Sequence, residues 1–167
     1  MEENSTLEIL KQAILLEKRG KAFYRNVAEK TDNRAMKDVF EMMAAEEQEH
    51  INTLSEQFKA YRKEKKFIPG SHKDSESSSV ASKVLTEEIK EKISAAGFEA
   101  AAISAAILME ERAVKLYSES LENTSDPEAK ALFEWLIRWE REHLSLLLDI
   151  DKALKEKIWF DNQFWPF

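Results

Sequence analysis

The sequence carries the same pattern of charged, aromatic and apolar residues twice, and the two copies align without a gap after a shift of 93 positions. The coinciding pairs include Glu17/Glu110, Tyr24/Tyr117, Phe40/Phe133, Glu47/Glu140 and His50/His143. Coincident leucines or alanines are common between any two helical segments, whereas shared glutamates, histidines and tyrosines indicate a duplicated structural unit. Each copy consists of two amphipathic segments separated by a short break, so the repeated unit is a helical hairpin.

The composition of the chain favours an all-α fold. Only three glycines and three prolines occur among the 167 residues, while charged residues make up 34%. Such a composition suits long amphipathic helices and provides few turns for a sheet. We therefore predict one domain over residues 1–167, a four-helix bundle of two antiparallel hairpins whose core draws on 43% hydrophobic residues.

The predicted helices span residues of about 6–30, 34–63, 98–123 and 127–157. Ser5 and Glu8 form a capping box at the start of the first helix, and Pro127 suits the first turn of the last one. Residues 64–97 are too long for a hairpin turn, so we expect them to form a crossover between the two hairpins. The aromatic tail, residues 158–167, is expected to pack on the bundle or on a partner.

Each predicted helix carries one glutamate within a stripe of otherwise apolar or small residues. In the first helix, for example, Ala13, Glu17 and Tyr24 share one face. Because these stripes must face the core, the glutamates are directed inward. Each glutamate lies about fifteen residues from its hairpin turn, so a rise of about 1.5 Å per residue brings all of them to one height. The inward polar residues are Glu17, Glu47, His50, Glu110, Glu140 and His143.

These residues together predict a site for two metal ions. Carboxylates in a dry core lose their hydration and repel one another, whereas two divalent cations would compensate their charge. In each Glu-x-x-His pair the i, i+3 spacing places both side chains on one face toward one ion. Oxygen-rich ligands with one histidine per ion favour iron or manganese over structural zinc or calcium. The alternative is a metal-free core whose acids are protonated or paired with Lys21 or Arg112, which lie off the inward faces.

The sequence leaves open the roles of several residues near the predicted ligands. Tyr24 and Tyr117 point inward, where they donate hydrogen bonds to the ligand carboxylates, gate radicals, or act as core aromatics with a satisfied hydroxyl. Glu46 and Glu49 are expected to point to water or to a partner, although one of them could orient a ligand histidine. His72 lies in the crossover, where we expect it to be solvated.

The composition also excludes several classes of protein. The chain has no cysteine, which excludes disulfides, thiolate nucleophiles, cysteine-bound zinc and iron–sulfur clusters. A net charge of −7 disfavours binding to nucleic acid. The acidic N-terminus does not resemble a signal peptide, and no apolar stretch is long enough to span a bilayer. We therefore expect a cytoplasmic protein that binds neither membranes nor nucleic acid.

From Leu7 to about Lys157 the motifs resemble the rubrerythrin branch of the ferritin-like di-iron carboxylate proteins, including the tyrosine seven residues after each first-helix glutamate. The resemblance implies a ferritin-like bundle that reduces hydrogen peroxide to water with electrons from two ferrous ions, as a response to oxidative stress. It implies no catalytic residue beyond the metal ligands. By motif position, one iron would be bound by Glu17, Glu47 and His50 and the other by Glu110, Glu140 and His143, with Glu47 and Glu140 as bridges.

Two departures from the rubrerythrin pattern affect the predicted function. The sequence contains no rubredoxin domain, so electrons are expected from an external donor such as a rubredoxin-type protein. Ala113 stands where rubrerythrins carry an additional glutamate. This leaves open an iron-binding or ferroxidase protein without a substrate, as well as a dimanganese protein with catalase-like activity. A homodimer is expected because rubrerythrin bundles usually pair and the aromatic tail offers apolar surface.

Overall fold

The structure, a computed structural model, describes residues 2–72 and 97–162, with side chains for residues 5–72 and 97–157. The helices in this part of the chain are α1 (Glu2–Lys30), α2 (Arg34–Glu64), α4 (Phe98–Asn123) and α5 (Pro127–Asn162). No strand occurs in these two ranges, which confirms the predicted all-α class. Within the same ranges, no helix combines the length and the apolar character that crossing a membrane requires.

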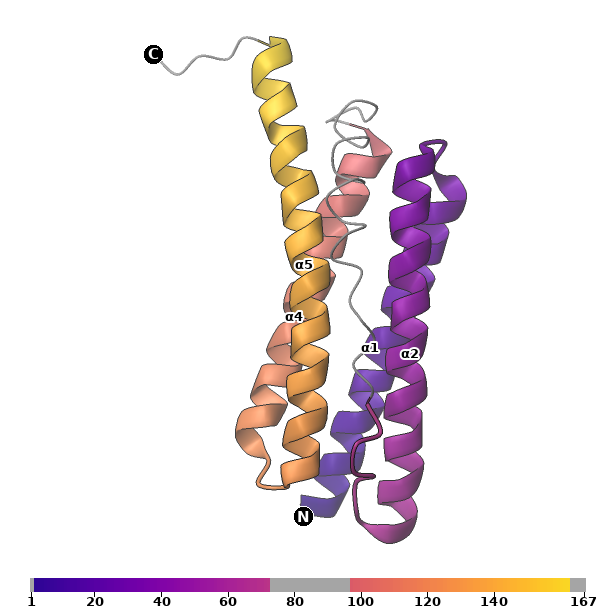
Figure 1. The fold of residues 1–167 in the computed structure, drawn as a ribbon, viewed down its shortest axis with the longest axis vertical. Helices are drawn as coiled ribbons and strands as arrows, with labels where there is room; N and C mark the ends of the chain where they lie inside the picture. The colour runs from indigo at the N-terminus through magenta and orange to yellow at the C-terminus, as the bar shows by residue number, and fades with distance from the viewer. Residues whose placement is uncertain (1, 73–96, 163–167) are drawn as a thin grey trace.

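The helices form two antiparallel hairpins that pack side by side (Figure 1). Helix α1 packs along α2, α4 packs along α5, and α1 also contacts α4. In Figure 1, α1 and α5 run upward while α2 and α4 run downward, so the connection between the hairpins must travel from one end of the bundle to the other. This order of directions is that of ferritin-like bundles with one long crossover. Residues 73–96 of the crossover lie outside the described part of the chain.

Side-chain caps fix the start of the second helix in each hairpin. The Oδ1 atom of Asn33 accepts a hydrogen bond from the backbone N–H of Met36 at 3.1 Å, at the start of α2. At the start of α5, Oδ1 of Asp126 accepts bonds from the backbone N–H groups of Glu128 and Ala129 at 2.8 and 3.1 Å. Each cap satisfies N–H groups that have no partner within the helix, so both hairpin turns are sharply defined.

Two helix boundaries differ from the prediction. Helix α1 begins at Glu2 rather than near residue 6, so Ser5 lies inside the helix and the predicted capping box does not start it. Helix α5 continues to Asn162, five residues beyond the predicted end, so the aromatic tail begins later than residue 158. Both extensions lack glycine and proline, and nothing in their sequence forces the helix to stop. Residues 163–167 lie outside the described part.

The first part of the crossover folds back along α2. Lys65 ends the helix in the left-handed conformation, with φ of 56°. The buried side chain of Gln57 then binds the backbone of Ile68 twice, accepting from its N–H at 2.8 Å and donating to its carbonyl at 2.9 Å. This pair of bonds places Phe67 in the core, where it is 6% exposed.

The fold-back carries His72 onto the bundle. Its ring lies 5.8 Å from that of Trp135, measured between centroids, and the side chain is half-buried. The expectation that His72 is solvated is therefore wrong, because contact with an indole removes much of the imidazole from water.

The core consists of two apolar halves separated by one polar layer. One half lies toward the α1–α2 turn and includes Tyr24, Phe40, Met43, Ile103, Ala106 and Leu147. The other lies toward the α4–α5 turn and includes Leu10, Ala13, Leu54, Ala113, Tyr117 and Phe133. Along every helix, the inward glutamate falls between a residue of one half and a residue of the other, so the four glutamates share the intervening layer.

Candidate metal centre

The six inward polar residues meet in the layer between the two apolar halves. Each is at most 3% exposed. They come from the four described helices: α1 provides Glu17, α2 provides Glu47 and His50, α4 provides Glu110, and α5 provides Glu140 and His143. Four carboxyl groups and two imidazoles are thus buried in one layer of the core.

These residues form two groups of four that could each hold a metal ion. One group contains Glu17, Glu47, His50 and Glu140; the other contains Glu47, Glu110, Glu140 and His143. Within each group, one potential ligand atom per residue lies within 4.8 Å of the others. Glu47 and Glu140 belong to both groups, so the two potential ion positions share two carboxylates.

The shared glutamates turn one oxygen toward each histidine. The Nδ1 atom of His50 lies 3.4 Å from Oε2 of Glu47 and 3.1 Å from Oε1 of Glu140. The Nδ1 atom of His143 lies 3.6 Å from the other oxygen of each, Oε1 of Glu47 and Oε2 of Glu140. A carboxylate with one oxygen in each group has the orientation required to bridge two ions.

The two remaining glutamates each contact one histidine and one tyrosine. Glu17 lies 3.2 Å from Nδ1 of His50 through Oε2, and its Oε1 accepts a hydrogen bond from Tyr117. The Oε1 atom of Glu110 lies 3.5 Å from Nδ1 of His143 and accepts a hydrogen bond from Tyr24. Each tyrosine therefore binds a carboxyl group of the opposite hairpin. Of the roles left open for the tyrosines, the structure contains the hydrogen bond to a carboxyl group of the cluster.

The shared glutamates, Glu47 and Glu140, are called central, and Glu17 and Glu110 are called outer. The two kinds differ in their affinity for protons. Burial raises the pKa of Glu17 well above its usual value, and the nearby charge of Glu140 raises it further. Burial and Glu140 likewise raise the pKa of Glu110 to about 8. Burial also favours the neutral form of Glu140, but the positive charge of His50 and the hydrogen bonds from His143 and His50 together outweigh it and hold the pKa of Glu140 below its usual value.

The two histidines bind protons more tightly than free imidazoles do. Burial acts to lower the pKa of His50, yet Glu140 raises it well above the usual value. Burial opposes the charge on His143 in the same way, and Glu110 with its neighbours raises the pKa of that histidine. Glu47 keeps a lowered pKa despite its burial, because it accepts hydrogen bonds from surrounding groups. The raised pKa values of Glu17, Glu110 and both histidines, together with the lowered ones of Glu47 and Glu140, favour a metal-free cluster of low net charge.

The donor set of the cluster fits two metal ions. Oε2 of Glu47, Oε1 of Glu140 and Nδ1 of His143 are buried and lack a hydrogen-bond partner in the described part of the chain. Such atoms destabilise a core unless something binds them. Oxygen donors with one nitrogen per ion suit iron or manganese. The alternative of pairing with basic residues finds no support, because Lys21 donates to Gln48 and Arg112 is exposed.

Three further residues contact the histidines from outside the cluster. Oε2 of Glu46 lies 2.7 Å from Nε2 of His143, so Glu46 is the neighbour of Glu47 that orients a histidine. The rings of Trp135 and Trp139 meet the ring of His50 edge-on, at centroid distances of 5.3 and 5.7 Å. Sequence reasoning did not identify the two tryptophans. The four-residue spacing from Trp139 to His143 could have indicated that Trp139 lies beside the histidines, since residues four apart share one face of a helix.

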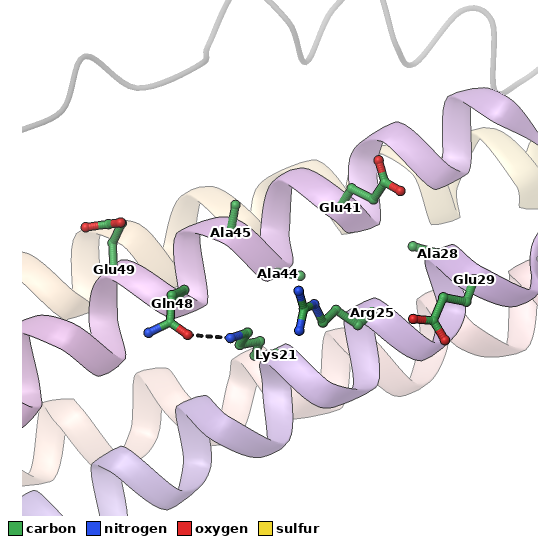
Figure 2. A pocket seen from close by; sticks show the side chains of 9 residues that line it. All are labelled: Lys21, Arg25, Ala28, Glu29, Glu41, Ala44, Ala45, Gln48 and Glu49. Carbon is green, nitrogen blue, oxygen red and sulfur yellow. Dashed lines mark hydrogen bonds between the residues drawn. The ribbon is translucent and has the colours of Figure 1, made fainter.

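A separate groove lies on the outer side of the α1–α2 hairpin (Figure 2). It has a volume of about 650 Å³ and contains none of the six clustered residues. Lys21 and Gln48 are hydrogen-bonded in it, and its lining contains basic side chains such as Arg25 as well as acidic ones such as Glu49. Since its lining is of mixed charge, the groove indicates no particular ligand.

A ferritin-like bundle with two Glu-x-x-His pairs and two further glutamates in one buried layer is the arrangement from which the ferritin-like carboxylate proteins build their two-metal sites. The family model described as Rubrerythrin matches residues 8–151, and the chain belongs to the rubrerythrin family. No curated protein and no solved structure matches the sequence significantly. The match confirms the resemblance drawn from the repeated motifs.

Proposed function

We propose that this protein holds two iron ions and uses them to reduce hydrogen peroxide to water with electrons from an external redox protein. The proposed ligands are Glu17, Glu47, His50, Glu110, Glu140 and His143. The observation that carries the proposal is the orientation of the two central glutamates, each with one oxygen beside His50 and the other beside His143. In a metal-free core this arrangement keeps four carboxyl groups and two imidazoles away from water, at a cost in desolvation, whereas two bound cations would use the oxygens and nitrogens that face one another.

The residues around the cluster would support this chemistry in separate ways. Two bound iron ions would supply the two electrons that, with two protons, convert hydrogen peroxide into two molecules of water. Glu47 and Glu140 would hold the two positions at a fixed separation. Tyr24 and Tyr117 would keep the outer carboxylates in place, and their phenols stay protonated because burial raises the pKa of both. The apolar halves of the core would exclude bulk water.

Electrons would reach the site from a second protein. The chain has no cysteine and therefore no thiolate-bound iron of its own. A rubredoxin-type protein is the class of donor that suits a rubrerythrin-family partner. The resemblance to rubrerythrins also supports a homodimer, and a cytoplasmic location fits the acidic chain.

The proposal is tested by peroxide turnover. The iron-loaded protein, reduced without oxygen, should be oxidised by about one equivalent of hydrogen peroxide per pair of irons, and a reduced rubredoxin-type donor should sustain turnover. Glu47→Gln should abolish both reactions, while Glu49→Gln, which removes an exposed carboxylate two residues away, should leave them unchanged. If the reduced protein reacts with oxygen but peroxide never turns over with a donor, peroxide reduction is the wrong function.

Oxidation of Fe(II) without a peroxide substrate is the second candidate, and Ala113 favours it. This residue is 5% exposed in the core of α4, at the position where rubrerythrins carry an additional glutamate. The chain therefore has one carboxylate fewer than a typical rubrerythrin. Aerobic oxidation of added Fe(II) together with absent peroxide turnover would support this candidate. Metal analysis of protein purified without added metal distinguishes both from a dimanganese protein.

A further inference from the structure

The repeat that duplicates the cluster breaks at the residue before each Glu-x-x-His pair. The shift of 93 positions that superimposes His50 on His143 also superimposes Glu46 on Trp139. The two hairpins therefore provide the same inward ligands but different outer neighbours for their histidines.

His143 has a carboxylate behind it. Its Nε2 atom lies 2.7 Å from Oε2 of Glu46, which is 19% exposed, while its Nδ1 atom faces the cluster. A hydrogen bond from Nε2–H to Glu46 leaves the lone pair on Nδ1 and holds the ring in the orientation needed to bind an ion. Carboxylates in this position also make the imidazole a stronger base, and their loss typically weakens metal binding by about 10–100-fold.

No carboxylate in residues 5–72 or 97–157 supports His50 in this way. Its Nδ1 atom faces the cluster in the same way, but its Nε2 atom is buried and has no hydrogen-bond partner in the described part of the chain. The rings of Trp135 and Trp139 lie against it instead. An indole offers a donor and no acceptor oxygen, so it cannot accept the hydrogen of Nε2. Among the described residues, packing rather than a hydrogen bond to Nε2 determines the orientation of His50.

We propose that the two metal positions are unequal, and that the His143 position binds its ion more tightly because Glu46 acts as a positioning residue for His143. The His50 position is then the weaker and more readily exchanged of the two. This inference rests on the proposed two-metal centre, and it adds an order of loading that the shared inward ligands do not imply.

Sequential filling of the unaltered protein is not a sufficient test. The first ion neutralises part of the negative charge of Glu47 and Glu140, so a second ion would bind more weakly even in a symmetric site. The repeat offers a better comparison, because His50→Ala and His143→Ala each leave one complete position. In a symmetric site, these two variants would bind one ion with equal affinity.

The test is an anaerobic titration of both variants with Co(II), followed by calorimetry and by the visible absorption of the bound ion. The His50→Ala protein, which keeps His143 and Glu46, should bind its ion at least 10-fold more tightly than the His143→Ala protein. Adding Glu46→Gln should remove most of that advantage from the His50→Ala protein and change its absorption spectrum. In the His143→Ala protein, Glu46→Gln should have no effect on affinity.

A matched control is Glu49→Gln, which removes the same charge from an exposed site on the same helix and should leave every affinity unchanged. Equal affinities of the two histidine variants, or equal effects of Glu46→Gln in both, would overturn the inference while leaving the metal centre intact. Absence of Co(II) binding by the unaltered protein would instead overturn the proposed function. If either histidine variant does not fold, the Glu46→Gln protein with both histidines present is titrated with Co(II) instead. This substitution should weaken only the first of the two binding steps. An unchanged first step contradicts the inference.

Discussion

The hydroxyl of Tyr117 on α4 donates a hydrogen bond to Glu17 on α1, across the boundary between the two hairpins. Tyr24 on α1 makes the reciprocal bond to Glu110 on α4. Both phenols are almost completely buried, at 0% and 1% exposure. Because burial and the facing carboxyls raise the pKa of both tyrosines, each remains a donor. The pair thus links the hairpins at the level of the cluster.

Removing either hydroxyl should weaken the metal-free protein. Tyr117→Phe keeps the ring but leaves Oε1 of Glu17 without its donor in a dry layer, which should lower the free energy of unfolding by about 1–2 kcal/mol. Tyr24→Phe should have an effect of the same size, since the repeat gives it the same role. Urea denaturation followed by circular dichroism measures both. Tyr61→Phe, a control outside the cluster, should change the free energy much less, and equal losses for all three variants would contradict a special role for the two bonds.

The repeat explains why so much of the cluster could be predicted from the sequence. Glu17 and Glu110 each occupy a polar position in an apolar stripe, and their distances from the hairpin turns match. Periodicity and rise per residue are local properties of a helix, so they determine which face and which height a residue takes. The structure brings the predicted inward residues together in one buried layer.

Local patterns could not provide the contacts that depend on how the hairpins pack. The periodicity of α4 directs Tyr117 inward, but it does not show that the hydroxyl reaches Glu17 on another helix. Likewise, Glu46 is adjacent to the inward face of α2, and its contact with His143 depends on the packing of α2 against α5. The ends of α1 and α5 were also misjudged, because helices without a glycine or proline near the end extend until other interactions stop them.

The metal-free protein should be most stable at mildly acidic pH. Burial and Glu140 raise the pKa of Glu110 from 4.5 to about 8. Its contribution to stability is therefore complete below its unfolded pKa and is lost as the pH rises through about 8. The pKa values of His50 and His143 are also raised, so their contributions disappear in the same direction. Glu140 acts in the opposite direction: its pKa is lowered, and its contribution is lost as the pH falls.

Thermal unfolding in the presence of a chelator tests this pH dependence. The midpoint should be highest near about pH 5–6 and fall as the pH approaches about 8.5. Glu110→Gln should make the fall at higher pH shallower, whereas Glu111→Gln, an exposed neighbour, should not. A midpoint that rises steadily from pH 6 to 8.5 would contradict the assignment of raised pKa values to the cluster.

Metal binding should release protons. In the metal-free cluster the pKa of Glu110 is about 8, so this group carries a proton near neutral pH, and the raised pKa values of Glu17 and both histidines favour their protonated forms. Bound glutamates must be ionised and bound histidines neutral, so the binding of two ions should displace at least about one proton at about pH 7. Calorimetric titration with Mn(II) in buffers of different ionisation enthalpy measures the number released. Binding of two ions with release of fewer than about one proton would show that other residues hold them.

Gly20 provides a test of how tightly Glu47 is held. This glycine is buried in the interior of α1, where a Cβ atom would lie 3.5 Å from Cδ of Glu47, an ordinary contact distance. The repeat places Ala113 at the equivalent position of α4. Gly20→Ala should therefore fit and should raise the free energy of unfolding by about 0.5–1 kcal/mol, because alanine favours a helix over glycine by about that amount.

The exposed Ala22 on the same helix calibrates that effect. Ala22→Gly should lower the free energy of unfolding by about 1 kcal/mol through helix propensity alone. If Gly20→Ala raises stability by a similar amount, the methyl group has been accommodated beside Glu47, and the affinity for metal should stay within about threefold of that of the unaltered protein. If the variant is less stable than the original, Glu47 must be packed so closely against α1 that the glycine is needed for the carboxylate to reach both histidines.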